Sequence, residues 1–333
     1  MTGKLYGTLG PACAQPDTLR AMFRAGMRGM RLNLSHGTLQ ESGAWVNRMH
    51  CAAAAEGVRS ELIIDLQGPE VRIGALAQPI ALEAGGEITL GEDFPVPPCV
   101  PEHIADGDEL LLDDGQFSLR VLDAAHARCR VERGGLLLPR KSIAIAGREL
   151  PAPALTELDR ENLRCAARFG VTGVMQPFVR GKEDLLAVRA ALREENAGVL
   201  RIFAKVENQT GLHKLNEIIQ YSDAVVVARG DLGNAMPLWE LPRAQEHIVR
   251  ACRAAGRAVM VSTQMLHSMQ HSAVPTRAEL MDVYHAARST CCSPAKRRRG
   301  STLRRRCAFL PKLPAAAGRT QVAVIDIILP GGL

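Results

Sequence analysis

The chain has 333 residues, 47% of them hydrophobic and 23% charged, which excludes an intrinsically disordered protein. Its net charge is +6, but residues 291–333 hold nine Lys/Arg and one Asp, a balance of +8, so the rest of the chain sums to −2. The main body is therefore nearly neutral, and its charge gives no reason to expect nucleic acid as a partner.

No part of the sequence indicates a secreted or membrane protein. The first residues lack the apolar core of a signal peptide, and no apolar stretch approaches the length of a membrane span. The nine cysteines include no CxxC pair, so we interpret them as reduced thiols. These features predict a cytoplasmic protein with no membrane partner.

Apolar runs alternate with helical patterns along most of the chain. The apolar runs predict buried parallel strands at residues 5–9, 28–35, 62–65, 173–175, 200–205, 224–229 and 258–262. Helical periodicity predicts helices at residues 16–26, 39–56, 156–169, 182–195, 210–221, 243–255 and 277–287. Seven such units predict an α/β fold, a (β/α)₈ TIM barrel that lacks a recognisable eighth unit.

The pattern changes between the third predicted strand and the third predicted helix. Residues 73–148 consist of short alternating segments with turn signals such as Gly134-Gly135, which predict a small β-rich inserted domain. We therefore divide the chain into a first part of the barrel (1–72), the inserted domain (73–148), a second part of the barrel (149–287) and a basic tail (288–333).

The tail is rich in Arg, Pro, Cys and Ala, and it has no helical or strand period up to Arg319. This composition predicts a disordered segment. Basic runs also serve as nuclear-localisation or nucleic-acid signals. We favour disorder without nucleic acid, because no aromatic side chains alternate with the arginines to stack on bases.

Charged side chains follow two of the predicted strands. Lys205 and Glu207 stand at the end of one strand, and Asp231 follows the next. The C-terminal ends of barrel strands meet at one rim, where the active sites of such barrels lie. Two carboxylates beside a lysine suit a divalent metal ion that holds an oxyanion. For each residue taken alone, a surface ion pair is the alternative interpretation.

The motifs around these strand ends resemble those of the pyruvate kinase family in order and in spacing, from about residue 4 to about residue 287. They are Thr8-Leu9-Gly10-Pro11-Ala12, Arg31-Leu32-Asn33-Leu34-Ser35-His36-Gly37, Asp65-Leu66-Gln67-Gly68-Pro69-Glu70-Val71-Arg72, Ala204-Lys205-Val206-Glu207-Asn208, Ala228-Arg229-Gly230-Asp231-Leu232-Gly233, Ser262-Thr263-Gln264-Met265-Leu266 and Pro275-Thr276-Arg277-Ala278-Glu279.

The resemblance implies a glycolytic phosphotransferase that converts phosphoenolpyruvate and ADP to pyruvate and ATP. It implies that Glu207 and Asp231 hold Mg²⁺. It also implies that Lys205 and Arg31 are catalytic residues that bind the substrate and stabilise the transferring phosphoryl group. The inserted domain occupies the position of the β-rich lid domain of that family.

Other roles follow from the same resemblance. Thr263 is implied to lie beside the substrate as a third catalytic residue, and the backbone at Gly230 and Asp231 to hold the substrate carboxylate. A glutamate at Glu70 implies dependence on K⁺. The implied K⁺ site consists of Asn33, Ser35, Asp65 and Leu66, and the implied nucleotide-binding residues are Asn33, His36, Arg72 and Lys141.

Two other functions compete with this interpretation: a non-catalytic fragment, and a Mg²⁺-dependent barrel lyase that handles phosphoenolpyruvate or pyruvate. The inserted domain and the Arg31 motif argue against a lyase, which needs no nucleotide site. His267 and His271 have the i,i+4 spacing of a metal site. We do not expect zinc there, because the sequence offers no third ligand.

The last part of the chain departs from the family. Pyruvate kinases continue with an eighth barrel unit and with a C-terminal domain that carries regulation and part of the homotetramer interface, and residues 288–333 resemble neither. We interpret these residues as the product of truncation or of a shifted reading frame. Because strands beside the missing unit would have unpaired edges, we expect an aggregation-prone chain with little activity.

Overall fold

The chain forms two compact units, unit 1 (Met1–Gly68 with Ala154–Leu333) and unit 2 (Pro69–Pro153). The inserted unit thus begins at Pro69 rather than at residue 73, and it ends at Pro153 rather than at residue 148. This computed structural model describes residues 4–35, 37–113, 115–148, 150, 152–263, 265–270, 272, 274–288 and 325–329. None of the helices among them is both long and apolar enough to cross a bilayer.

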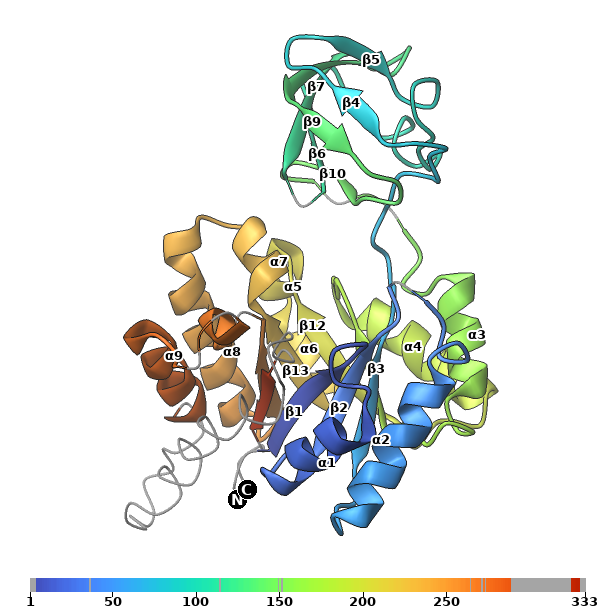
Figure 1. The fold of residues 1–333 in the computed structure, drawn as a ribbon. Coiled ribbons are helices and arrows are strands. Elements are labelled where there is room, and N and C mark those ends of the chain that lie inside the picture. The colour runs from blue at the N-terminus through green and yellow to red at the C-terminus, as the bar shows by residue number, and fades with distance from the viewer. Residues whose placement is uncertain are drawn as a thin grey trace. The chain divides into compact units, whose positions relative to one another are not determined.

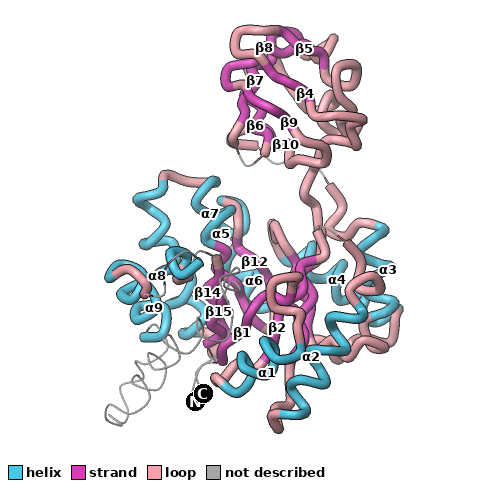
Figure 2. Tube along the Cα trace, viewed as in Figure 1, coloured by secondary structure: helices cyan, strands magenta, loops and turns pink. Residues whose placement is uncertain are grey.

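Unit 1 is an α/β barrel whose sheet closes on itself, as Figures 1 and 2 show. Seven of its strands run parallel, because each is buried on both faces and is followed by a helical connection. In order around the barrel, the strands are β1 (Lys4–Leu9), β15 (Ile325–Leu329), β14 (Ala258–Ser262), β13 (Ala224–Ala228), β12 (Arg201–Val206), β11 (Gly173–Gln176), β3 (Glu61–Asp65) and β2 (Gly29–Asn33).

The eighth place of the barrel is occupied by β15, which runs antiparallel to both of its neighbours. Ile328 is paired with Lys4 of β1 and with Met260 of β14. The expectation of unpaired edges on β1 and β14 is therefore wrong, although this antiparallel strand does not form a recognisable eighth βα unit. A β-branched run can supply an antiparallel strand without the crossover helix that a parallel strand needs.

The expectation that residues 288–333 are disordered is also contradicted where the structure describes them. Ile325–Leu329 forms β15, and Arg288 is the last residue of a helix. The Val and Ile residues between positions 322 and 328 are typical of a strand. The composition of the tail did not predict this strand, because the Arg-, Pro- and Ala-rich segment that precedes these residues dominates it. The remaining tail residues, 289–324 and 330–333, lie outside the described part of the chain.

Helices surround the barrel sheet (Figure 1) and bury their apolar faces against it. The predicted helix at 210–221 is divided in two at Lys214, and a short helix that the sequence did not predict begins at Arg229. The helices are α1 (Pro16–Arg24), α2 (Gly43–Ala55), α3 (Glu157–Cys165), α4 (Lys182–Glu194), α5 (Gln209–His213), α6 (Leu215–Tyr221), α7 (Arg229–Asn234), α8 (Leu241–Ala254) and α9 (Arg277–Arg288), with single turns η1 (Leu238–Glu240) and η2 (His267–Gln270).

Two aromatic rings, Tyr6 and Phe203, help to fill the interior of the barrel and are fully buried. Glycines on neighbouring strands make room for them. A Cβ on Gly29 would lie 2.5 Å from the Tyr6 ring, and a Cβ on Gly173 would lie 2.6 Å from the Phe203 ring. Larger residues at either glycine would displace these rings, so the packing of the barrel interior depends on both glycines.

Unit 2 is an all-β unit with its own apolar core. A five-stranded antiparallel sheet has the order β10-β6-β7-β8-β5, and β4 pairs with β9 in a second, two-stranded sheet. The strands are short and alternate between buried and exposed residues, as in sheets with one solvated face. Their bounds are β4 (Ile80–Leu82), β5 (Glu87–Thr89), β6 (Glu109–Leu112), β7 (Phe117–Asp123), β8 (Arg128–Arg133), β9 (Gly135–Leu137) and β10 (Ile143–Ile145).

Candidate functional site

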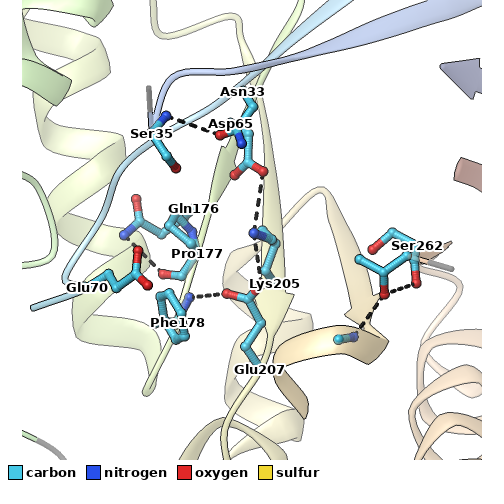
Figure 3. A network of polar contacts seen from close by, with 12 residues as sticks. Asn33, Ser35, Asp65, Glu70, Gln176, Pro177, Phe178, Lys205, Glu207 and Ser262 are labelled. Atoms are coloured by element: carbon cyan, nitrogen blue, oxygen red, sulfur yellow. Dashed lines mark hydrogen bonds and ion pairs between the residues drawn. The ribbon is translucent and has the colours of Figure 1, made fainter. Parts of the chain in front are cut away.

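A chain of charged side chains lies at the C-terminal rim of the barrel in unit 1. The Lys205 ammonium at the end of β12 is 2.8 Å from Glu207 Oε1 and 3.4 Å from Asp65 Oδ2 at the end of β3. Figure 3 shows Lys205 between the two carboxylates. Arg31 of β2 contacts the same carboxylate oxygen, with its Nη2 2.6 Å from Asp65 Oδ2. Strands β2, β3 and β12 thus bring together four residues that the sequence singled out.

Lys205 remains charged although only 13% of its side chain is exposed. Burial lowers the pKa of the ammonium, but the Asp65 and Glu207 carboxylates outweigh it, and the pKa lies above its ordinary value. Burial likewise acts to raise the pKa of Asp65, yet Lys205 and Arg31 hold it below its usual range. The Lys205 ammonium therefore provides a positive charge at the rim over the whole physiological pH range.

Glu207 has the most perturbed carboxyl of the site. Burial, together with the nearby Asp231 charge, raises its pKa to about 8, although Lys205 acts to lower it. Glu207 Oε2 accepts a hydrogen bond from the Phe178 N–H at 2.7 Å. The buried Oε1 faces the Lys205 ammonium at 2.8 Å. A bound cation would add positive charge here and would lower the pKa of Glu207.

The donor set fits the two ions that the sequence implies. For Mg²⁺, Glu207 and Asp231 supply hard oxygens, and the Asp231 carboxylate forms no ion pair with any described residue. For K⁺, Asp65 Oδ1 is buried and lacks a hydrogen-bond partner in the described part of the chain. Asn33 Oδ1 beside it accepts the Ser35 N–H at 3.1 Å. No cluster of three or more His, Cys, Asp or Glu suited to a metal occurs among the described residues.

Thr263, directly after β14, adopts a strained backbone. Its φ is +67°, an outlier for a β-branched residue. The strain is held in place by hydrogen bonds: Thr263 Oγ1 accepts the Gly230 N–H at 2.9 Å and donates to the Ser262 carbonyl at 2.7 Å. A Cβ on Gly230 would meet Thr263 at 3.8 Å, an ordinary contact, so the packing of the protein itself does not require glycine there.

Arg229 holds this part of the rim together, a role that the sequence did not reveal. Its Nη2 donates to the Thr263 carbonyl at 2.6 Å, and its Nη1 is 2.6 Å from Asp282 Oδ1 of α9. Arg229 thereby joins the end of β13 to the loop after β14. Its position directly before Gly230 and Asp231 was the only available signal in the sequence.

The remaining predicted residues are not placed in this cluster. Glu70, Arg72 and Lys141 belong to unit 2, where Arg72 forms an ion pair with Glu70 and Lys141 Nζ lies 2.8 Å from Asp113 Oδ1. The Leu66 N–H is bonded to the Met175 carbonyl, which fixes the backbone after β3. His36 lies outside the described residues, and so does His271 of the histidine pair.

Comparison with known proteins yields consistent matches. A family model described as the pyruvate kinase barrel domain matches residues 2–290. A pyruvate kinase of Aeropyrum pernix is 38% identical over 293 residues, which cover 86% of this chain and 64% of that protein. A pyruvate kinase of Agrobacterium vitis is also 38% identical over 293 residues, 84% of this chain and 60% of that protein.

A Glycine max protein named as a cytosolic isozyme of pyruvate kinase is 36% identical over 303 residues, 85% of this chain and 58% of that protein. The chain therefore spans about three fifths of the length of these relatives. The matched region extends through both parts of the barrel and the inserted unit.

Proposed function

The chain belongs to the pyruvate kinase family, and on that basis we propose that it transfers the phosphoryl group of phosphoenolpyruvate to ADP, giving pyruvate and ATP. The observation that supports this reaction best is the buried, charged Lys205 between Asp65 and Glu207 at the barrel rim. Such a fixed charge stabilises the transferring phosphoryl group and the enolate that its departure leaves.

Each residue of the rim contributes one function to this proposal. Glu207 and Asp231 would hold Mg²⁺, which supplies electrophilic stabilisation of phosphoryl oxygens when it is bound. Arg31, held by Asp65, binds the phosphoryl group of the substrate. Thr263 lies beside the substrate, near the point at which the enolate carbon receives a proton, and the backbone at Gly230 and Asp231 binds the substrate carboxylate.

The proposed nucleotide-binding residues are the four that the family resemblance implies. Asn33 is the last residue of β2, His36 comes three residues later in the sequence, and Arg72 and Lys141 belong to unit 2. A guanidinium and an ammonium suit the phosphates of ADP. We propose Mg²⁺ and K⁺ as the cofactors, with Asn33 and the neighbouring implied oxygens as the K⁺ ligands.

The direct test is pyruvate formation by the purified chain with phosphoenolpyruvate, ADP, Mg²⁺ and K⁺. Glu207→Ala and Asp231→Ala should each abolish most turnover and weaken Mg²⁺ binding measured by calorimetry, because the metal loses one of two protein carboxylates. Glu246→Ala, which alters an exposed carboxylate of α8, is the matched control and should behave as wild type. Full turnover in both site variants would refute the metal assignment.

The K⁺ requirement is tested through Glu70. The proposed activity should need K⁺, and Glu70→Lys should relieve that need by supplying an ammonium in place of the ion. Turnover is compared in K⁺ and in tetramethylammonium at equal ionic strength. Equal turnover of the wild-type chain in both salts contradicts the assignment.

A further inference from the structure

The chain passes between the two units twice, after Gly68 and before Ala154. Close to both passages lies Asp159, the third residue of α3, whose side chain is completely buried in unit 1. A buried carboxylate is costly unless hydrogen bonds compensate its lost solvation. The donors that satisfy Asp159 therefore show what this residue holds together.

Asp159 accepts hydrogen bonds from both passages. On the outgoing side, the Gln67 N–H donates to Oδ1 at 2.8 Å, and the Gly68 N–H donates to Oδ2 at 3.0 Å. On the returning side, the Thr156 N–H and the Thr156 hydroxyl each donate to Oδ2 at 2.9 Å. One carboxylate thus joins segments that are about 90 residues apart in sequence.

A capping box explains only half of this arrangement. Thr156 and Asp159 form the reciprocal pair that caps α3, with the Asp159 N–H donating to Thr156 Oγ1 at 3.1 Å. A capping box needs no contact with Gln67 and Gly68. Asp184, at the third position of α4, makes only the local contacts of a helix N-terminus. It accepts hydrogen bonds from the N–H and the guanidinium of Arg180.

Two more contacts hold the same passages against β11. The Gln176 side chain donates to the Ala154 carbonyl at 2.7 Å, and Figure 3 shows Gln176 beside Pro177. Gly68 has a φ of +63°, and a Cβ there would lie 2.4 Å from Pro177 Cγ. Only glycine allows the outgoing chain to pass this close to the barrel.

We propose that Asp159 is a positioning residue that anchors both passages to the barrel and so restricts the positions that unit 2 adopts. The two passages then leave the barrel from fixed points, and motion of unit 2 begins beyond Gly68 and Ala154. Any consequence for catalysis rests on the proposed function, which assigns nucleotide binding in part to Arg72 and Lys141 of unit 2.

The test is the distribution of distances between spin labels attached through unnatural amino acids at Arg48 of unit 1 and Glu83 of unit 2, both exposed. Asp159→Asn replaces an acceptor oxygen by an amide that faces N–H donors, so the distribution should broaden. Asp184→Asn removes a comparable helix-capping carboxylate elsewhere and should lower Tm without broadening. An unchanged distribution in Asp159→Asn, or equal broadening in Asp184→Asn, overturns the proposal.

Hydrogen exchange of the wild-type chain gives a test that needs no variant to fold. The Gln67 and Gly68 amides lie just beyond β3, yet they should exchange as slowly as the amides within β3. Rapid exchange at both amides overturns the proposal. Pyruvate formation is measured on the same samples: an inactive wild-type chain with slow exchange at these amides refutes the proposed reaction and leaves the anchoring role intact.

Discussion

Lys205 is needed both for charge balance and for the proposed chemistry at the barrel rim. Its ammonium is the nearest positive charge to Glu207 Oε1, whereas Asp65 also has the Arg31 guanidinium. Without the ammonium, the pKa of Glu207, already raised to about 8, would rise further. Lys205 therefore favours the carboxylate form of Glu207, which is the form that the proposed metal site requires.

Replacement of this lysine should affect turnover more than substrate binding. Lys205→Met should lower kcat by about 10²–10³-fold, because the charge acts chiefly on the transition state. The KM for phosphoenolpyruvate should change little, since Arg31 remains. Steady-state kinetics at saturating Mg²⁺ measure both constants, with Lys214→Met at an exposed site as the control. A variant that only raises KM would make Lys205 a ground-state binder instead.

At the scale of secondary-structure elements, one motif shared with the family proves to be a helix start. Glu279 Oε2 accepts the Thr276 N–H at 2.8 Å, and Thr276 Oγ1 accepts the Glu279 N–H at 3.2 Å, which is a capping box for α9. Glu279 also accepts the Ser268 N–H at 2.6 Å. The motif therefore fixes α9 and the turn η2, next to the helix face that carries Asp282.

The same carboxylate predicts how stability depends on pH. Burial acts to raise the pKa of Glu279, but the hydrogen bonds from Ser268 and Thr276 outweigh it and lower the pKa to about 2, from an ordinary 4.5. A lowered pKa in the folded state stabilises the fold above pH 4.5, and this contribution is lost as the pH falls toward 2.

Glu279→Gln should therefore lower Tm at neutral pH, and the difference from wild type should shrink as the pH falls below about 4.5. Thermal unfolding followed by circular dichroism at a series of pH values measures this difference. Glu246→Gln, on the exposed face of α8, should show almost no difference at any pH. A Tm difference for Glu279→Gln that is constant over the whole series contradicts the assignment.

For the molecule as a whole, closure of the barrel depends on five residues near the end of the chain. Ile327 is paired with Leu5 of β1 and with Val261 of β14, so β15 satisfies two strand edges at once. Unpaired strand edges were one reason to expect aggregation and little activity, and β15 removes that reason. The pyruvate assay tests whether this chain is active.

Ile327→Pro should open the barrel, because proline has no N–H and is excluded from central strands. The loss of one or two buried hydrogen bonds, about 2 kcal/mol, should lower Tm by roughly 4–8 °C for a unit of this size. Ile327→Val keeps the backbone donor and serves as the matched control. If the two variants have the same Tm, β15 does not contribute to the stability of the fold.

The sequence by itself determined the family, the α/β class, seven barrel strands and the β-rich insertion. Each of these follows from local patterns: apolar runs, turn residues and motifs at strand ends such as Lys205 and Asp231. The family assignment is confirmed by comparison, and the class and the strands by the structure. Periodicity is a property of neighbouring residues, and so it is visible without a fold.

Only the tertiary structure decided which distant groups meet. The antiparallel place of β15, the strained Thr263 held by Arg229 and the contacts of Asp159 with Gln67 and Gly68 all join segments that are far apart in sequence. No local pattern encodes such contacts, because they depend on how the closed sheet brings its strand ends together. The sequence thus named the residues of the rim, and the barrel determined their partners, their burial and their charge.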